Sequence, residues 1–174
     1  MAFDFHFKKS NKIDGVWIIT PTVSKDERGI IWSSFIKEEF EKFLPDGVFF
    51  KHDKFSESKK NVLRGIHCDS KSWKLVTCIH GAIQQVVVDL RKESNTYNSY
   101  ESFNIDSKSQ KLILIPPYIG NAYLVLSNRV TYHYKLAYHG NYFDADEQFS
   151  FKWNDPIFDI KWYASNPVLS DRDS

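Results

Sequence analysis

The stretch that decides the fold is residues 61–91, which read NVLRGIHCDSKSWKLVTCIHGAIQQVVVDLR. Apolar and β-branched side chains alternate or run together on both sides of Gly81, a pattern typical of short, partly buried strands. The same stretch carries a base, His67, and two fixed cations, Arg64 and Lys74. A histidine held among cations on a rigid sheet can remove a weakly acidic proton and stabilise the resulting anion. The stretch therefore predicts a β protein that acts as an enzyme on a negatively charged small molecule.

Short strand-like runs separated by turn residues extend over most of the chain. We expect strands at residues 15–21, 29–35, 48–55, 62–69, 74–80, 82–90, 101–105, 111–115, 122–127 and 129–138. One amphipathic stretch, 37–44, is the best helix candidate, and a second short helix fits the less regular C-terminal third. This pattern predicts an all-β sandwich or barrel with one or two short helices, formed by residues 1–174 as a single domain.

Composition and charge limit the partners that we expect. The net charge of +1 gives no reason to expect bulk binding to nucleic acid or to a membrane. Residues 1–10 hold no apolar run of signal-peptide length, and no stretch approaches the roughly 18 apolar residues of a membrane span, so we expect a cytoplasmic protein. Cys68 and Cys78 are then expected to be reduced thiols. Their spacing matches no common zinc pattern, so we expect no metal.

Several short motifs together give the chain a recognisable pattern. They are Asp26-Glu-Arg-Gly29, Val62-Leu-Arg-Gly-Ile-His67, Lys74-Leu-Val76, Asp89-Leu-Arg91, Pro116-Pro117, Tyr134-Lys135, Asn154-Asp-Pro156, Trp162 and Leu169-Ser-Asp-Arg-Asp173. In these motifs, which run in family order over most of its length, the chain resembles the dTDP-4-dehydrorhamnose 3,5-epimerase family. The resemblance implies a cupin-like β jelly roll, usually dimeric. It also implies action on a nucleotide-linked 4-keto sugar without a metal or other cofactor.

The reaction that the resemblance implies needs a base, an acid and a stabiliser of the enolate. A carbonyl at C4 acidifies the hydrogens on C3 and C5, so inversion needs a base on one face of the sugar and a proton donor on the other. His67 is the candidate base, because an imidazole titrates near neutral pH. Tyr134, in the Tyr-Lys motif, is the candidate acid, although Tyr132 and Tyr138 share its strand face.

Two charged groups are expected to support these residues. Lys74 is the candidate partner of the enolate oxygen at C4, with Asp89 as the acid expected to hold its ammonium in place. Asp173 is expected to hydrogen-bond to His67 and to set its tautomer and basicity. Asp171 lies two residues away and is the alternative for this role.

The nucleotide end of the substrate needs phosphate contacts and a stacking surface. Arg64 and Arg28 are the candidates for the pyrophosphate, since a planar guanidinium suits phosphate oxygens. The resemblance implies that Arg28 reaches the site from the partner subunit of a homodimer. Trp32 and Trp73 are guesses for the aromatic residue that stacks on the base or on a ring.

The chain departs from the family pattern where the substrate pocket is expected. Asn121 stands where the family has a histidine, and the string around Ser33 lacks the usual glutamate. His52 and Lys54 replace the usual glutamine and asparagine. These four positions are expected to bind substrate. The strings around Lys54 and Asn121 look like a branch that acts on GDP-4-keto-6-deoxy-heptoses for capsular polysaccharide, which is the main expectation; a dTDP-linked hexose of the rhamnose pathway is the alternative.

Two other classes of function remain open from the sequence. Asp69 lies two residues after His67, so the chain could be a metal-dependent cupin. The asparagine at position 121 leaves room for a sugar-nucleotide binding protein without catalysis. It also leaves open an enzyme that inverts C3 but not C5, because a polar group that handles the second proton could be missing.

Overall fold

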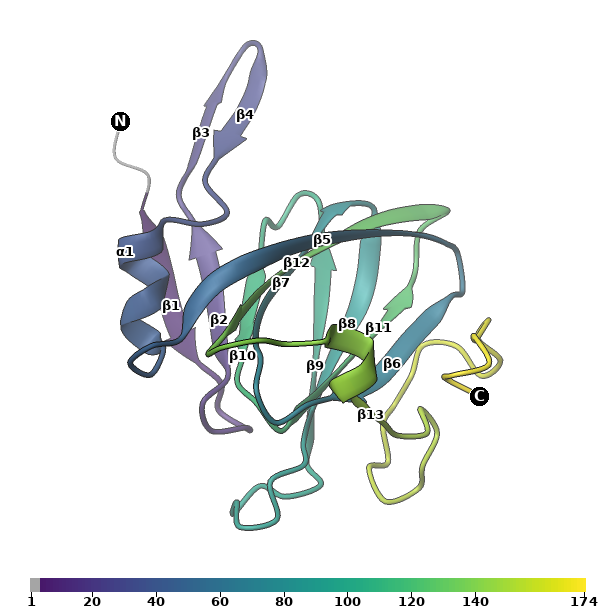
Figure 1. The fold of residues 1–174 in the computed structure, drawn as a ribbon. Helices are drawn as coiled ribbons and strands as arrows, with labels where there is room; N and C mark the ends of the chain where they lie inside the picture. Colours follow the sequence, from purple (N-terminus) through teal and green to yellow (C-terminus); the bar gives the residue numbers. More distant parts are fainter. Residues whose placement is uncertain (1–3) are drawn as a thin grey trace.

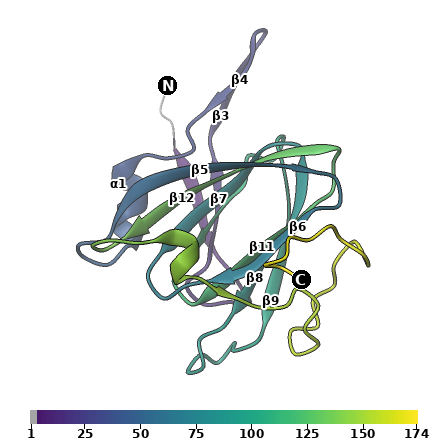
Figure 2. The same ribbon diagram turned by 45° about the vertical axis from the view of Figure 1, so that its right-hand side comes forward.

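Two antiparallel sheets face one another and enclose the core of the protein (Figures 1 and 2). The computed structural model describes residues 4–174, so the first three residues of the N-terminal stretch considered above lie outside it. The six-stranded sheet has the order β1 (Phe5–Lys9), β2 (Trp17–Pro21), β10 (Leu112–Ile115), β7 (Trp73–His80), β12 (Arg129–Tyr138), β5 (Phe49–Lys59). The five-stranded sheet has the order β13 (Phe149–Ser150), β6 (Leu63–Cys68), β11 (Ile119–Val125), β8 (Ala82–Asp89), β9 (Tyr100–Asp106). The all-β, cupin-like fold is confirmed.

The core lies between the sheets because both contribute apolar side chains to one cluster. Val76 and Tyr132 from the six-stranded sheet pack with Val87 and Ile105 from the five-stranded sheet. Burial of each such side chain stabilises the fold by roughly 1.5–3 kcal/mol. The β7–β8 turn depends on Gly81, because a Cβ atom there would collide with the carbonyl oxygen of the neighbouring chain segment. The cluster thus fixes the spacing of the two sheets.

The predicted helix is present but short. It begins as α1 (Lys37–Phe40) and continues as the 3-10 helix η1 (Glu41–Phe43) before Pro45. Phe40 is fully buried and meets the ring of Phe5 edge-on at 4.8 Å, which holds the helix against β1. A second 3-10 helix, η2 (Asp144–Glu147), precedes β13. Among residues 4–174, no helix is long and apolar enough to cross a membrane.

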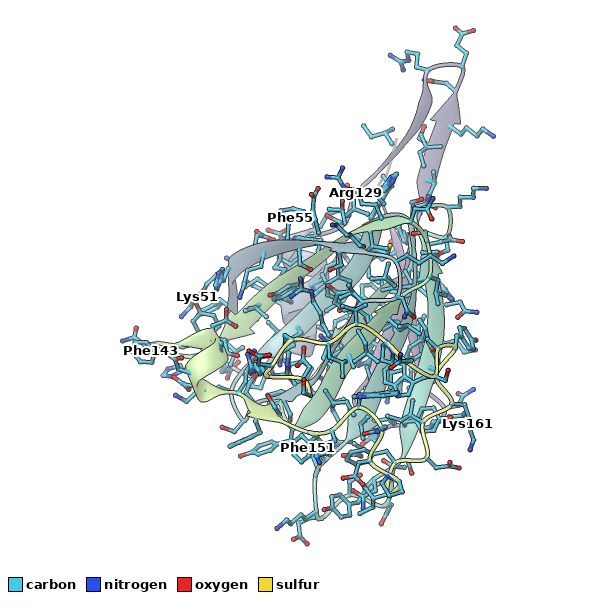
Figure 3. All side chains as sticks on the ribbon, turned by 90° about the vertical axis from the view of Figure 1, so that its right-hand side faces the viewer. Lys51, Phe55, Arg129, Phe143, Phe151 and Lys161 are labelled. Atoms are coloured by element: carbon cyan, nitrogen blue, oxygen red, sulfur yellow. The ribbon has the colours of Figure 1, made fainter. Side chains whose placement is uncertain are left out.

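A two-stranded hairpin, β3 (Val23–Asp26) and β4 (Gly29–Trp32), projects from the barrel (Figures 1 and 3). Its side chains include Ile30 and Ile31, which are 49% and 59% exposed. These adjacent apolar side chains on a projecting ribbon offer surface that a second protein could cover. The hairpin also carries Arg28 at its turn.

The turn after β8 is organised by one buried carboxylate. Asp89 accepts hydrogen bonds from the Arg91 guanidinium at 2.9 and 2.7 Å and from the hydroxyls of Ser94 and Thr96, each at 2.6 Å. Burial raises the pKa of Asp89, but these donors outweigh it and lower the pKa to about 2. The carboxylate is therefore stabilised in its charged form by the fold.

This carboxylate should make stability depend on pH in the acid range. An aspartate in the unfolded chain titrates near ~3.9, above the pKa of folded Asp89. The stabilisation is therefore complete above about pH 4 and is lost as the pH falls towards about 2, an effect on the order of 2 kcal/mol. We expect Asp89→Asn to unfold with a shallower acid dependence in urea titrations at stepped pH. An equally steep dependence in the variant would contradict this account.

Candidate active site

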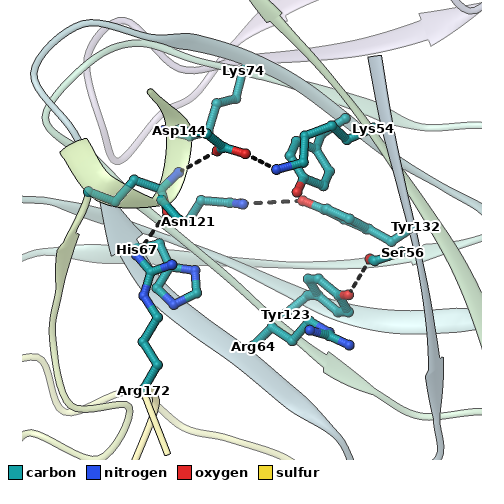
Figure 4. A pocket seen from close by; sticks show the side chains of 13 residues that line it. Lys54, Ser56, Arg64, His67, Lys74, Asn121, Tyr123, Tyr132, Asp144 and Arg172 are labelled. Carbon is teal, nitrogen blue, oxygen red and sulfur yellow. Dashed lines mark hydrogen bonds and ion pairs between the residues drawn. The ribbon is translucent and has the colours of Figure 1, made fainter. Parts of the chain in front are cut away.

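A pocket of about 190 Å³ opens between the two sheets (Figure 4). Strands of both sheets, the η2 segment and the C-terminal residues line it. The lining residues are Lys54, Ser56, Arg64, His67, Lys74, Asn121, Tyr123, Tyr132, Tyr134, Asp144, Ala145, Gln148 and Arg172. Six of the residues predicted for the site, from five different strands, therefore line the same cavity.

His67 on β6 is paired with an acid from the C-terminal end of the chain. Its Nε2 lies 2.6 Å from Oδ1 of Asp173, which is 5% exposed and also accepts a hydrogen bond from the Ser170 hydroxyl at 3.0 Å. Burial raises the pKa of Asp173, but the hydrogen bond and charge of His67 outweigh it and leave the pKa below its usual value. Asp171 is exposed, so the structure gives the contact with His67 to Asp173. The carboxylate holds the imidazole in one orientation at the pocket wall.

Lys74 on β7 is held by Asp69, which corrects the expectation that Asp89 would hold it. The ammonium lies 2.6 Å from Oδ2 of Asp69, and both side chains are buried. Asp69 also accepts from the Ser72 hydroxyl at 2.6 Å and from the Tyr142 hydroxyl at 3.0 Å. Burial raises the pKa of Asp69, but the charge and hydrogen bonds of Lys74, together with Ser72, lower it overall. Asp89 instead accepts hydrogen bonds from Arg91, Ser94 and Thr96 in the turn after β8.

The three tyrosines of the pocket differ in what their hydroxyls contact. The Tyr123 hydroxyl lies 2.8 Å from that of Ser56, and the Tyr132 hydroxyl donates to Oε1 of Gln85 at 2.9 Å. The rings of Tyr123 and Tyr132 stack with centroids 4.1 Å apart. Within residues 4–174, the structure gives the Tyr134 hydroxyl no hydrogen-bond partner. Tyr134 is therefore the phenol of the three that is left for a ligand.

Four cations line the pocket, and two of them, Lys74 and Lys54, already have a carboxylate as counter-ion. Arg64 donates to the Ser58 hydroxyl at 3.1 Å, and Lys54 on β5 forms an ion pair with Asp144 of η2 across the cavity (Figure 4). Arg172 lines the pocket as well. Sequence reasoning missed Arg172 as a site residue, although it lies inside the Leu169–Asp173 motif directly before the acid that contacts His67. The surplus of cations suits a ligand with phosphate groups.

Several predicted residues lie away from this pocket. Arg28 is exposed at the hairpin turn and pairs with Asp26 at 2.5 Å, so a single chain does not bring it to the cavity. Ser33 and His52 are half-buried and do not line the pocket. Trp32 and Trp73 pack against the separate apolar cluster around the α1 helix and do not line this pocket, and their stacking on a substrate stays a prediction.

The described residues offer little for a metal ion. Among residues 4–174, no three His, Cys, Asp or Glu side chains gather as a metal site requires. Asp69 lies beside His67 in sequence, but its oxygens are taken up by Lys74 and by hydroxyl donors. Burial raises the pKa of both Cys68 and Cys78 to about 12, so neither presents the thiolate that binds metals.

The fold and the pocket define a class of cupin-like epimerase, in which a His–Asp pair, a buried lysine and a tyrosine meet in a β barrel. The family model described as dTDP-4-dehydrorhamnose 3,5-epimerase matches residues 10–174. The dTDP-4-dehydrorhamnose 3,5-epimerase of Salmonella typhimurium is 34% identical over 93% of this chain and 89% of its own. The chain belongs to the dTDP-4-dehydrorhamnose 3,5-epimerase family and is an isomerase.

Solved structures similar to this chain agree with the family assignment. The dTDP-6-deoxy-D-glucose-3,5-epimerase of Legionella pneumophila, in complex with dTDP-4-keto-L-rhamnose, superimposes with a TM-score of 0.88 at 30% identity, covering 98% of this chain and 90% of that one. A 3′-monoepimerase from Streptomyces bikiniensis, in complex with dTDP-quinovose, has a TM-score of 0.85 at 28% identity, covering 95% and 84%. The similar structures thus include both a 3,5-epimerase and a monoepimerase.

Proposed function

We propose that the protein inverts C3, and in the dual reaction also C5, of a nucleotide-linked 4-keto-6-deoxy sugar without a cofactor. The observation that carries this proposal is the placement of acid and base on opposite walls of one pocket. His67 lies on β6 of the five-stranded sheet, whereas Tyr134 on β12 and Lys74 on β7 belong to the six-stranded sheet. A sugar between the sheets would have the base on one face and the proton donor on the other, as inversion requires.

Each residue then has a role that its surroundings support. His67 removes the proton next to the C4 carbonyl, and Asp173 stabilises the imidazolium that forms. Lys74 stabilises the negative oxygen of the enolate from a buried position where its charge acts strongly. Tyr134 returns a proton from the other face, and Arg64 with Arg172 contacts the phosphates.

The comparisons favour a dTDP-linked hexose over the GDP-linked heptose that the sequence resemblance implied. The names of the relatives refer to dTDP-4-dehydrorhamnose, and two of the similar structures carry dTDP sugars. The heptose is the second candidate, supported by Lys54 and Asn121, which depart from the family pattern and line the pocket. We therefore take dTDP-4-dehydro-6-deoxyglucose as the first substrate to test. Cytoplasmic location and a single epimerase domain stay predictions.

A second copy of the chain would complete the phosphate site. We propose a homodimer in which the hairpin of one subunit reaches the pocket of the other and supplies Arg28. The projecting hairpin, with exposed Ile30 and Ile31, supports this arrangement because it has apolar surface to bury. Size-exclusion chromatography with light scattering tests the dimer, and a monomeric protein with full activity would contradict it.

Deuterium incorporation tests the reaction directly. The protein is incubated in heavy water with a dTDP- or GDP-linked 4-keto-6-deoxy sugar, and the recovered sugar is examined for label at C3 and C5. Label at C3 only indicates a monoepimerase, and label at both positions indicates the dual enzyme. Absence of label with either nucleotide would contradict an epimerase and favour a binding protein. Thermal shifts with dTDP and GDP alone rank the two nucleotides.

Replacement of Tyr134 by Phe should separate proton removal from inversion. The phenol donates the returning proton, so the variant should invert the sugar roughly 10²-fold more slowly. Deuterium exchange should slow less, because His67 can still remove a proton and return one to the same face. The two rates are measured on one sample by mass spectrometry and by product stereochemistry. Equal losses in both rates would contradict the assignment of Tyr134 as the acid.

A further inference from the structure

Asn121 lies next to the catalytic histidine and is held by a buried polar network. It is the register partner of His67 across strands β11 and β6, and both side chains line the pocket (Figure 4). Its Oδ1 accepts a hydrogen bond from Nε2 of Gln85 at 2.7 Å, and the Tyr132 hydroxyl lies 3.4 Å from the same oxygen. Gln85 is fully buried and Tyr132 is 1% exposed. The mechanism proposed above uses neither of them.

Backbone carbonyls determine which way the amides of this network point. One terminal atom of Gln85 lies 3.0 Å from the carbonyl oxygen of Ala122 and 3.1 Å from that of Val86. A carbonyl oxygen can only accept, so this atom is the amide nitrogen. The other terminal atom is the oxygen, and Tyr132 donates to it at 2.9 Å. Burial raises the pKa of Tyr132 well above its usual value, so its hydroxyl keeps the proton that it donates.

The orientation of Asn121 follows from that of Gln85. The Gln85 nitrogen is a donor, so the Asn121 atom that faces it must be the oxygen. Reversal of the Asn121 amide would place its NH2 group 2.7 Å from the NH2 group of Gln85, an unfavourable contact between two donors in a buried site. The nitrogen of Asn121 therefore turns away from Gln85.

We infer that Gln85 and Tyr132 are positioning residues that fix Asn121 with its amide nitrogen towards the pocket, as a hydrogen-bond donor for an oxygen of the substrate. That oxygen belongs to the sugar or to the phosphate; both accept hydrogen bonds. An amide does not ionise, so Asn121 binds but does not relay a proton, as a histidine at this position could. The catalytic part of the inference rests on the proposed epimerase function, whereas the orientation of the amide does not.

The chain offers a matched control for Gln85. Gln84, its neighbour on β8, is also fully buried and uses its amide in full, donating to Ser102 and Lys161 and accepting from the backbone of Tyr163. It faces the other side of the sheet, away from the pocket, because side chains alternate along a strand. Gln84→Met and Gln85→Met thus remove the same buried amide on opposite faces of one strand.

The functional test compares these variants in deuterium exchange with the 4-keto nucleotide sugar. We expect Gln85→Met to lower kcat/KM about tenfold and the milder Tyr132→Phe about threefold, while Gln84→Met stays within about twofold despite a similar loss of Tm. A weaker affinity of Gln85→Met for the nucleoside diphosphate alone would assign the bonded oxygen to phosphate, and an unchanged affinity would assign it to the sugar. Equal kcat/KM values for Gln85→Met and Gln84→Met would overturn the positioning role.

Neutron diffraction from crystals of the deuterated wild-type protein tests the orientation independently. Two deuterons on the Asn121 atom that faces the pocket are expected. Deuterons on the atom that faces Gln85 would overturn the inference, whatever the substrate proves to be. A wild-type protein that incorporates no deuterium into the sugar would contradict the proposed function, and the neutron map would still decide how Asn121 is oriented.

Discussion

Replacement of His67 by Asn should abolish deuterium exchange at C3, with a loss of at least about 10³-fold in rate. Asparagine keeps a polar side chain of similar reach but cannot take up the proton. The same change leaves Asp173, a buried carboxylate, without the ring that now lies 2.6 Å away. A modest loss of thermal stability should therefore accompany the loss of exchange. Mass spectrometry of the sugar after incubation in heavy water measures the rate, and near-normal exchange would rule out His67 as the base.

A second histidine provides the control for this experiment. His133 on β12 is also mostly buried and lies 2.8 Å from a carboxylate, Asp53, but on the outer side of the sheet, where its ring stacks on Phe55 at 4.6 Å. His133→Asn also removes a His–Asp contact and does not touch the pocket; its partner Asp53 is 47% exposed and keeps Lys135 at 2.5 Å. We expect a change in Tm no larger than that of His67→Asn and an exchange rate within about twofold of wild type. A large loss of exchange in this variant would mean that loss of a His–Asp contact outside the pocket also stops the reaction, and the result for His67→Asn would then not identify the base.

Replacement of Lys74 by Met should impair both the reaction and the fold. The charge that stabilises the enolate is lost, so kcat should fall about 10²–10³-fold. Asp69 keeps its hydroxyl donors but loses its buried counter-ion, which should lower the free energy of unfolding by roughly 3 kcal/mol. Steady-state kinetics and urea unfolding measure the two effects. A variant with normal kcat would contradict the role of Lys74 at the enolate oxygen.

The control for Lys74→Met is a variant that removes another ion pair with a buried aspartate, outside the pocket. Arg91 donates to the buried Asp89 at 2.7 Å in the turn after β8, which is not part of the pocket. Arg91→Met should therefore destabilise the fold by a similar order while kcat stays close to wild type. If both variants lose kcat in proportion to stability, the effect of Lys74→Met is structural rather than catalytic.

The strands could be predicted from the sequence where one face is apolar and buried. Strands β7, β8, β10 and β12 fall within one or two residues of their predicted bounds, because their burial follows the apolar pattern. Strand β5 runs four residues further than predicted, to Lys59, through the polar string Ser56–Lys59, which pairs with β12 rather than following an apolar period. Strands β1, β3 and β13 were missed; β3 is mostly exposed and has no apolar pattern to detect.

The candidate site could be predicted only as far as the motifs reach. His67, Lys74, Tyr134 and Asp173 were named from the sequence and lie together or in contact with a lining residue. Lys74 was assigned the wrong partner because Asp69 lies in the turn between β6 and β7. The direction of a side chain in a turn cannot be predicted from the alternation of apolar and polar residues. The ion pair of Lys54 with Asp144 joins residues 90 positions apart, a contact that only the fold can bring about.

The division of the site between two sheets has a consequence for the stereochemistry of the product. In the proposed mechanism, a proton that leaves towards β6 and returns from the side of β12 arrives on the opposite face of the carbon, so the packing of the barrel would set the handedness of the product. Core residues such as Val76 and Val87 set the distance between the two sheets and therefore between the proposed acid and base. Val76 is the strand partner of Tyr134 and Val87 that of Asn121, so changes in the size of these apolar side chains would shift pocket residues without altering any polar group and would alter how faithfully the substrate is inverted.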